Sequence, residues 1–321
     1  MDGYKIRKRP RLRNAYLVCG WPGMGEVAFR AVNYLTEKLK AEEFAEIEAG
    51  EFFYLTGSSI KTGVLSAPEL PCGKFYYWKN KTGKNDVVVF ISSAQPDLSR
   101  AESYSRKITH IARLFNVKTI VSFAAMPQPI DHSQPPKVWV ASTSAALNNN
   151  LKNYNLNILS EGQISGMNGL FLGLAKNEGF EGFCLLGEIP LYTIQIENPK
   201  SSYAVLEAFA RIAKLNIDLS ELLSQAHIME TEINKLMDYL KIGNPLGPID
   251  ENDVEKIKKS LSQLTKLPSS IKDKIEQLFK EARSDIGRAK ELKVQLDSWN
   301  VYKEYEDRFL DLFKRSNEKG N

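Results

Sequence analysis

Over the first 218 residues, short apolar runs alternate with segments whose apolar residues recur at helical spacing. The runs have the length of buried strands, and Asp86–Ser92 (DVVVFIS) is rich in β-branched side chains. We expect strands at 15–20, 86–92, 118–124, 138–142 and 182–187, and helices at about 26–40, 99–115, 167–177 and 202–215. Strands that alternate with helices form a mostly parallel sheet covered on both faces, so residues 1–218 should form an α/β domain.

Two segments do not follow this alternation. Residues 51–78 combine aromatic strand-like runs with turn residues, which predicts hairpins at one edge of the sheet. Near the N-terminus, Tyr4 and Ile6 alternate with basic residues, which is typical of a solvated tail or an edge strand. We do not expect nucleic-acid binding there, because the segment lacks the aromatic stacking pattern of RNA-binding motifs.

Residues 219–321 have a different character and are expected to form a helical region. Leu219, Ala226, Ile233 and Leu240 repeat every seven residues, which predicts a helix, and Gly243–Pro248 (GNPLGP) ends it. The expected elements are a linking helix at 219–241, a short helix at 253–265 and a long helix at 269–315.

The long helix carries an apolar stripe from Ile271 to Trp299, with eight steps over 28 residues, or 3.5 residues a step. That period predicts a coiled-coil seam. The short helix would span only ~20 Å and the long one ~65 Å, so the stripe would need cover from another surface. We therefore expect a homo-oligomer whose contact includes Ile271, Leu278, Leu292, Leu296, Trp299, Tyr302 and Phe309.

The composition is that of a globular protein and does not indicate a secreted, membrane-bound or nucleic-acid-binding one. With 43% hydrophobic and 26% charged residues, the 321-residue chain is ordinary globular protein, and a net charge of +4 does not indicate nucleic acid or a membrane surface. The three cysteines form no Cys-x-x-Cys pair, and only about five apolar residues follow the basic N-terminus, too few for a secretory segment. We expect a cytoplasmic protein without a metal or other cofactor.

The sequence Gly20-Trp21-Pro22-Gly23-Met24-Gly25 lies between a strand and a helix, where glycines can cradle a phosphate. Glu26 and Val27 stand where a phosphate loop has Lys and Ser or Thr. We interpret the segment as a structural turn, with nucleotide binding by Gly20, Gly23 and Gly25 as the alternative.

A second candidate site is the proline-rich loop 127–136 (PQPIDHSQPP), which follows a predicted strand. Open α/β sheets bind ligands at the carboxyl ends of their strands. His132 and Asp131 in this loop, with Glu188 after another strand, are the residue types used in acid–base catalysis. A hydrolase-type enzyme is therefore an alternative to a purely structural loop, although the chain lacks a nucleophile elbow or a metalloprotease motif.

An ordered set of segments resembles the proteasome assembly chaperone family, in its archaeal and bacterial branch. The matching stretches are LVCGWPGMGEVAFRAVNYL (17–35), AEIEAGEFF (45–53), AAMPQPIDHSQPPKVWVAS (124–142), ISGMNGLFLGLA (164–175), LLGEIPLY (185–192) and PKSSYAVLEAFARIAKLNIDLSELL (199–223). The resemblance covers roughly residues 4–240 and leaves 241–321 as an extension.

The resemblance implies an α/β fold similar to the purine nucleoside phosphorylase scaffold and a non-catalytic assembly or scaffold role. The family loop often reads His-Thr-Arg-Pro, whereas here it reads His132-Ser133-Gln134-Pro135. Archaeal members can end in a hydrophobic–tyrosine–any-residue tail, which Asn317–Asn321 does not match. The expected partner is therefore left open as a proteasome subunit or another complex.

Overall fold

The computed structural model describes residues 3–55, 58, 60–68, 70–83, 85–241, 269–298 and 302–317. The chain divides into two compact units, Met1–Pro268 and Ser269–Asn321. Each unit is described by itself below.

The first unit is built on a nine-stranded sheet with the order β1-β3-β6-β7-β2-β8-β11-β9-β10. Its centre is parallel, because β2 pairs in parallel with β7 and β8, and β8 with β11. The central strands are β2 (Ala15–Gly20), β7 (Val87–Ser92), β8 (Val117–Gln128) and β11 (Glu181–Pro190). Antiparallel pairing extends the sheet on both sides of this centre. Beside β7 lie β6 (Gly73–Trp78), β3 (Glu42–Ile47) and β1 (Tyr4–Ile6), each antiparallel to the strand before it in the sheet. Beside β11 lies the antiparallel strand β9 (Val138–Ser142), which pairs in parallel with β10 (Asn157–Ile158).

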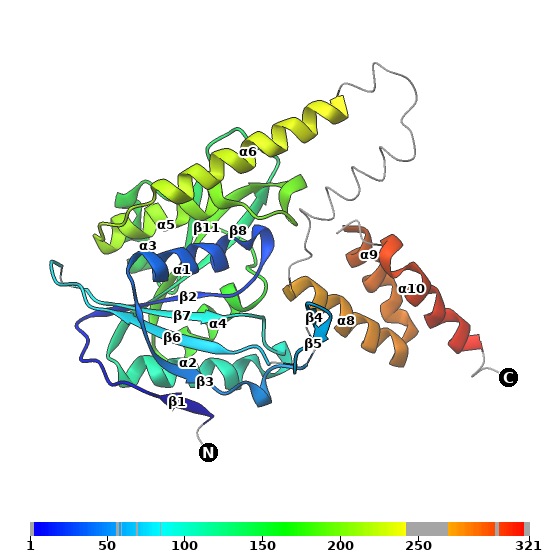
Figure 1. Ribbon diagram of the computed structural model, residues 1–321, viewed down its shortest axis with the longest axis horizontal. Helices are drawn as coiled ribbons and strands as arrows, with labels where there is room; N and C mark the ends of the chain where they lie inside the picture. The colour runs from blue at the N-terminus through cyan, green and yellow to red at the C-terminus, as the bar shows by residue number, and fades with distance from the viewer. Residues whose placement is uncertain are drawn as a thin grey trace. The chain divides into compact units, whose positions relative to one another are not determined.

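Helices cover both faces of the sheet (Figure 1), which confirms the predicted α/β class. The α1 and α5 helices pack on one face and α2 and α4 on the other. Residues of β2 alternate between the two cores: Leu17 and Cys19 belong to the core with α2 and α4, and Val18 to the core with α1 and α5. The helices are α1 (Val27–Lys38), α2 (Ala101–Leu114), α3 (Ala145–Leu151), α4 (Met167–Asn177) and α5 (Pro199–Ala213).

The sixth helix, α6 (Ser220–Lys241), agrees with the predicted linking helix but belongs to the first unit. Ala226 and Ile233 of the predicted seven-residue repeat are buried, as is Leu222, and the helix packs on α5. The division by contacts falls after Pro268, whereas the boundary predicted from the sequence lies at residue 218. The predicted short helix at 253–265 lies outside the described residues.

The predicted hairpin region also forms strands. β6 lies inside the main sheet between β3 and β7, while β4 (Ile60–Lys61) and β5 (Val64–Leu65) pair with each other as a separate two-stranded sheet. The basic N-terminal arm is an edge strand, β1, as one of the two readings predicted. Its Lys5, Arg7 and Lys8 pair with glutamates of β3 and the residue that follows it, so the structure gives these charges partners within the chain.

The single long helix predicted over 269–315 is wrong. The second unit contains α8 (Ser269–Ser284), a short 3-10 helix (Ile286–Arg288), α9 (Ala289–Ser298) and α10 (Tyr302–Asn317). The chain turns at Asp285, whose carboxylate accepts a hydrogen bond from the Gly287 N–H at 2.9 Å. An aspartate in that position caps a new helix instead of continuing the old one.

This turn allows the apolar stripe to be buried among the helices of the second unit, which contact one another. Leu278, Leu292, Leu296 and Phe309 are all buried, and Tyr302 is half-buried. The Phe279 ring stacks on Tyr305 with centroids 5.8 Å apart, and Arg308 forms an ion pair with Glu276 at 2.6 Å. The stripe therefore does not require a second subunit for cover. The side chain of Ile271 and all of Trp299 lie outside the described residues.

Candidate functional site

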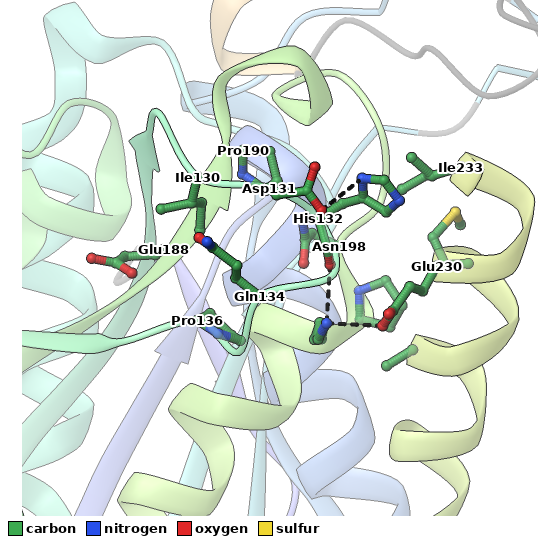
Figure 2. A pocket seen from close by; sticks show the side chains of 14 residues that line it. Ile130, Asp131, His132, Gln134, Pro136, Glu188, Pro190, Asn198, Glu230 and Ile233 are labelled. Atoms are coloured by element: carbon green, nitrogen blue, oxygen red, sulfur yellow. Dashed lines mark hydrogen bonds and ion pairs between the residues drawn. The ribbon is translucent and has the colours of Figure 1, made fainter. Parts of the chain in front are cut away.

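The carboxyl ends of β8 and β11 lead into the loop 129–137 and the start of α5, and α6 crosses beside them (Figure 2). A cavity of about 20 Å³ lies between these segments. It is lined by Ile130, Asp131, His132, Gln134, Pro136, Glu188, Pro190, Asn198, Pro199, Lys200, Ala226, Met229, Glu230 and Ile233. A volume of this size holds about one water molecule, whereas small-molecule sites usually measure ~300–1,000 Å³.

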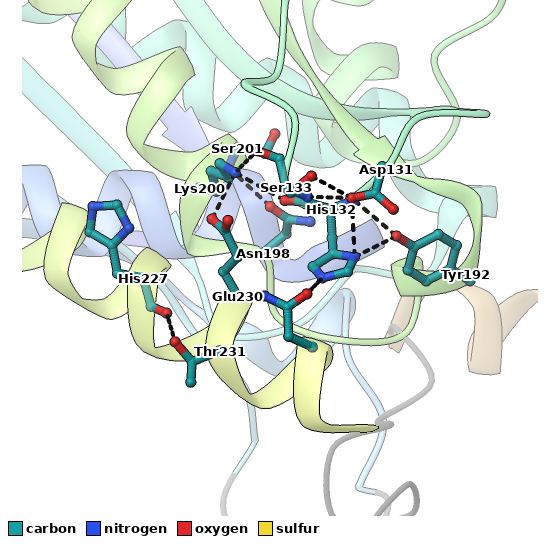
Figure 3. A network of polar contacts seen from close by, with 11 residues as sticks. Asp131, His132, Ser133, Tyr192, Asn198, Lys200, Ser201, His227, Glu230 and Thr231 are labelled. Atoms are coloured by element: carbon teal, nitrogen blue, oxygen red, sulfur yellow. Dashed lines mark hydrogen bonds and ion pairs between the residues drawn. The ribbon is translucent and has the colours of Figure 1, made fainter. Parts of the chain in front are cut away.

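His132 is buried and both of its ring nitrogens have partners (Figure 3). Nδ1 lies 2.8 Å from the Tyr192 hydroxyl and Nε2 lies 2.8 Å from Asn234 Oδ1. The same hydroxyl accepts a hydrogen bond from the His132 backbone N–H at 2.9 Å.

A ring that carries its proton on Nε2 is compatible with all of these contacts. Burial raises the pKa of Tyr192, so its hydroxyl keeps its proton at neutral pH and can donate to Nδ1 of His132. The ring proton then resides on Nε2 and is donated to Asn234 Oδ1. A neutral His132 with this tautomer has no lone pair directed at a substrate.

Asp131 does not act as the acid–base partner of His132. Its Oδ1 lies 3.6 Å from His132 Nδ1, beyond ordinary hydrogen-bond distance. The same oxygen accepts hydrogen bonds from the Ser133 backbone N–H at 2.9 Å and from the Ser133 hydroxyl at 2.6 Å. Asp131 therefore closes a local turn in the loop.

Glu188 is buried and engaged by a neighbouring strand. Its Oε1 accepts a hydrogen bond from Trp139 Nε1 at 2.8 Å, and its Oε2 accepts one from the Lys137 backbone N–H at 3.0 Å. In Figure 2 its side chain lies well away from the ring of His132. The structure thus brings the three predicted acid–base residues to one end of the sheet, but it does not assemble them into an acid–base pair.

Lys200, in the first turn of α5, joins the loop to α6. Its Nζ donates to the carbonyl oxygens of His132 and Ser133 at 3.0 and 2.8 Å and to Glu230 Oε2 at 2.8 Å (Figure 3). Together with the contact between His132 and Asn234, these bonds fasten the loop to α6. We call this set the polar cluster; it consists of His132, Tyr192, Lys200, Glu230 and Asn234.

Four members of the polar cluster were not predicted from the sequence: Tyr192, Lys200, Glu230 and Asn234. A signal for one of them was present, because Asn198 caps α5 by accepting from the Ser201 N–H and Pro199 occupies the first turn. That signature places Lys200 in the first turn of a helix. It does not reveal what the lysine contacts.

The glycine segment 20–25 is held by side chains of the protein itself. Asn168 Oδ1 accepts a hydrogen bond from the Trp21 N–H, and Asn168 Nδ2 donates to the Trp21 carbonyl, both at 3.0 Å. Gln95 Nε2 donates to the Pro22 carbonyl at 2.7 Å, and the Gly25 N–H donates to the Ile194 carbonyl at 2.9 Å. These internal bonds occupy donors that a phosphate would need, so the nucleotide alternative for Gly20, Gly23 and Gly25 gains no support.

The glycines have structural reasons to be there. A Cβ at Gly20 would lie 2.7 Å from a Val32 methyl group, so α1 can approach the end of β2 only because this residue has no side chain. Gly25 has a φ of 58°, which favours glycine. Both observations fit the predicted structural turn.

Among the described residues, no cluster of three or more His, Cys, Asp or Glu could hold a metal ion. No helix in the part of the chain that the structure describes is both long and apolar enough to cross a membrane.

The chain is similar in sequence and in structure to several archaeal proteins. Over 255 residues the chain is 28% identical to the uncharacterized protein MJ1210 of Methanocaldococcus jannaschii, covering 77% of this chain and 94% of that protein. Among solved structures it is similar to Pyrococcus furiosus PbaB, described as an archaeal proteasome activator, with 26% identity, a TM-score of 0.64 and coverage of 74% of this chain and 100% of PbaB.

Pyrococcus furiosus PbaA, described as an archaeal homolog of proteasome-assembly chaperone, shares the fold at 24% identity with a TM-score of 0.56, over 74% of this chain and 98% of PbaA. The model of the PAC2 family matches residues 17–237, which include most of the sheet and the whole polar cluster. This protein belongs to the PAC2 family.

Proposed function

We propose that this protein is a non-catalytic assembly or scaffold protein that acts through protein–protein contacts, in the manner of a proteasome assembly chaperone. Membership of the PAC2 family and the likeness to PbaB and PbaA support this role. The partner would be a proteasome subunit or a subunit of another complex, and the protein itself would be a homo-oligomer.

The observation that carries the proposal is the completeness of the polar cluster. The cavity lies at the end of the sheet where α/β enzymes bind substrates, and it has room for about one water molecule. Both ring nitrogens of His132 and both carboxylate oxygens of Glu188 have hydrogen-bond partners within the chain. A general base needs a free lone pair within reach of the proton it removes. The hydrolase alternative therefore lacks a substrate volume at this site, and both ring nitrogens of its candidate histidine are engaged within the chain.

Two buried cysteines support a cytoplasmic location. Cys19 and Cys184 are both free and buried. Burial raises the pKa of the Cys184 thiol to about 12, so it is protonated and inert at neutral pH. Unpaired thiols of this kind suit a reducing compartment.

The proposal can be tested with purified full-length protein and archaeal proteasome α-subunit rings. We expect a stable complex in size-exclusion chromatography with light scattering at micromolar concentration. The matched variant His132→Ala should bind as well as wild type, since the ring is not part of a reactive site. The proposal would be contradicted if no complex formed and the protein instead hydrolysed ester, amide or nucleoside substrates in a reaction abolished by His132→Ala.

A further inference from the structure

The strands β4 and β5 form a small hairpin outside the main sheet. Ile60 lies directly opposite Leu65, and Lys61 opposite Val64. The connecting residues Thr62 and Gly63 have φ values of 49° and 80°, which is the left-handed conformation of a tight two-residue hairpin turn. A Cβ built on Gly63 meets no atom of the described residues within 4 Å, so the tip of the turn is open on that side.

The hairpin exposes large apolar side chains. Ile60, Val64 and Leu65 are 67–68% exposed, and Leu55 shortly before the hairpin is 56% exposed. Ile60 and Leu65 are cross-strand partners and so lie side by side. Single exposed apolar residues are ordinary, but several together on one short element mark an interaction surface.

The segment around the hairpin is also poor in charge. Between Phe53 and Gly73 the sequence contains two charged residues, Lys61 and Glu69, one of each sign, whereas charged residues make up 26% of the whole chain. The residues that follow the edge strand β1 are the opposite case, because the basic side chains of Arg7 and Lys8 pair with glutamates along β3. Depletion of charge is characteristic of the core of a protein–protein interface.

We propose that the hairpin is the self-association surface of this protein and that its occupant is the same hairpin of a second copy. In a two-fold contact each residue meets the same patch on its partner, so a patch of one charge repels itself, whereas an apolar and nearly neutral patch complements itself. Self-association is part of the proposed function, and the inference rests on that part alone, not on the proteasome.

The outer edges of the hairpin backbone also favour the hairpin of a second copy as its partner. In the described part of the chain, β4 and β5 pair only with each other, so their outer edges are available to another strand. A two-stranded hairpin alone is marginally stable in water, and pairing with a second hairpin would yield a four-stranded sheet. The apolar side chains Ile60 and Leu65 would then be buried between copies.

Sedimentation velocity of the full-length protein tests this inference. We expect wild type to have at least twice the 36.3 kDa monomer mass at tens of micromolar. The double variant Ile60→Asp, Leu65→Asp should raise the dissociation constant by at least about 100-fold, because it places like charges and desolvated carboxylates in the contact. The matched control Ile228→Asp changes a residue of α6 that is 62% exposed and should leave the constant within about threefold of wild type.

A wild-type protein that remains monomeric overturns the inference, as does a hairpin variant that associates like wild type or a control that dissociates equally. Circular dichroism establishes that each variant is folded. If the aspartates impair folding, the uncharged variant Ile60→Ser, Leu65→Ser provides the same test with a smaller expected increase of about tenfold. Loss of α-ring binding with intact self-association would contradict the proteasome role and leave this inference standing.

Discussion

The side chains of the polar cluster have their partners within the chain, whereas the apolar side chains of the β4–β5 hairpin are exposed. In the cluster, His132, Tyr192 and Lys200 find partners within the chain, and little volume remains for anything else. In the hairpin, Ile60 and Leu65 remain exposed to solvent. Groups that are satisfied internally stabilise the fold, whereas groups left unsatisfied indicate a contact outside it.

This contrast has a direct consequence for mutagenesis. Substitutions in and around the polar cluster should lower the free energy of unfolding and leave self-association intact. Substitutions in the hairpin should do the reverse. Measuring both quantities for each variant therefore tests the comparison from both sides.

The largest loss of stability is expected for Glu188→Leu. The change leaves the Trp139 indole N–H and the Lys137 backbone N–H without their acceptor, which should cost about 2–4 kcal/mol in the free energy of unfolding. Urea denaturation measures the loss. Glu181→Leu, an exposed position on the same strand, is the matched control and should change stability by less than about 1 kcal/mol. Equal stability of the two variants would show that Glu188 is not a structural acceptor.

A smaller loss, about 1–2 kcal/mol at neutral pH, is expected for Tyr192→Phe, which removes the hydroxyl bonded to the backbone and ring of His132. The pH dependence has a definite sign. Burial raises the pKa of Tyr192 in the folded protein above its ordinary value near ~10, so the folded state retains a proton that the unfolded chain releases. Its contribution is complete below pH ~10 and is lost as the pH rises through the folded pKa.

Urea denaturation of wild type and Tyr192→Phe between pH 8 and about 10.5 isolates this residue from the other tyrosines. The difference in stability between the two proteins should narrow above pH ~10. A difference that stays constant across the range would contradict a protonated Tyr192 hydroxyl as the donor to His132.

The smallest effect on stability is expected for Leu65→Ser. Its side chain is 68% exposed, so the substitution should change the free energy of unfolding of the monomer by less than about 0.5 kcal/mol. Thermal unfolding at the lowest practical protein concentration measures this value without a contribution from association. A loss above about 1.5 kcal/mol would mean that the hairpin packs on its own chain, and the comparison with the polar cluster would fail.

Much of the α/β unit could be predicted from local patterns. The strands at 15–20 and 138–142 and the helix at 167–177 have the bounds that the structure shows. Prediction succeeded there because a buried strand must be continuously apolar and a helix on a sheet must be amphipathic. β3 was missed because its sequence EEFAEI is not continuously apolar. Its three glutamates pair with basic side chains of β6 and of the residues that follow β1.

The sequence indicated where the candidate site lies, but it did not indicate which residues its side chains contact. Strand ends located His132 and Glu188 at one end of the sheet, because the carboxyl ends of parallel strands meet there. The partners of His132 lie 60 and 102 residues further along the chain, at Tyr192 and Asn234. No local pattern connects positions so far apart, so a catalytic histidine and a structural one have the same appearance in the sequence.

By itself, the sequence determined the alternation of strands and helices, the seven-residue repeat of α6 and the apolar stripe from Ile271 to Trp299, because each depends on the spacing of neighbouring side chains. Only the tertiary structure decided what these apolar faces meet. Periodicity shows that a helix has a face to bury, but the turn at Asp285 determines that Leu278, Leu292 and Leu296 are buried within the helical unit itself. Whether an apolar face packs on its own chain or on another one depends on contacts between segments distant in the sequence. For that reason the sequence-based prediction placed the stripe against another subunit and gave the hairpin no role.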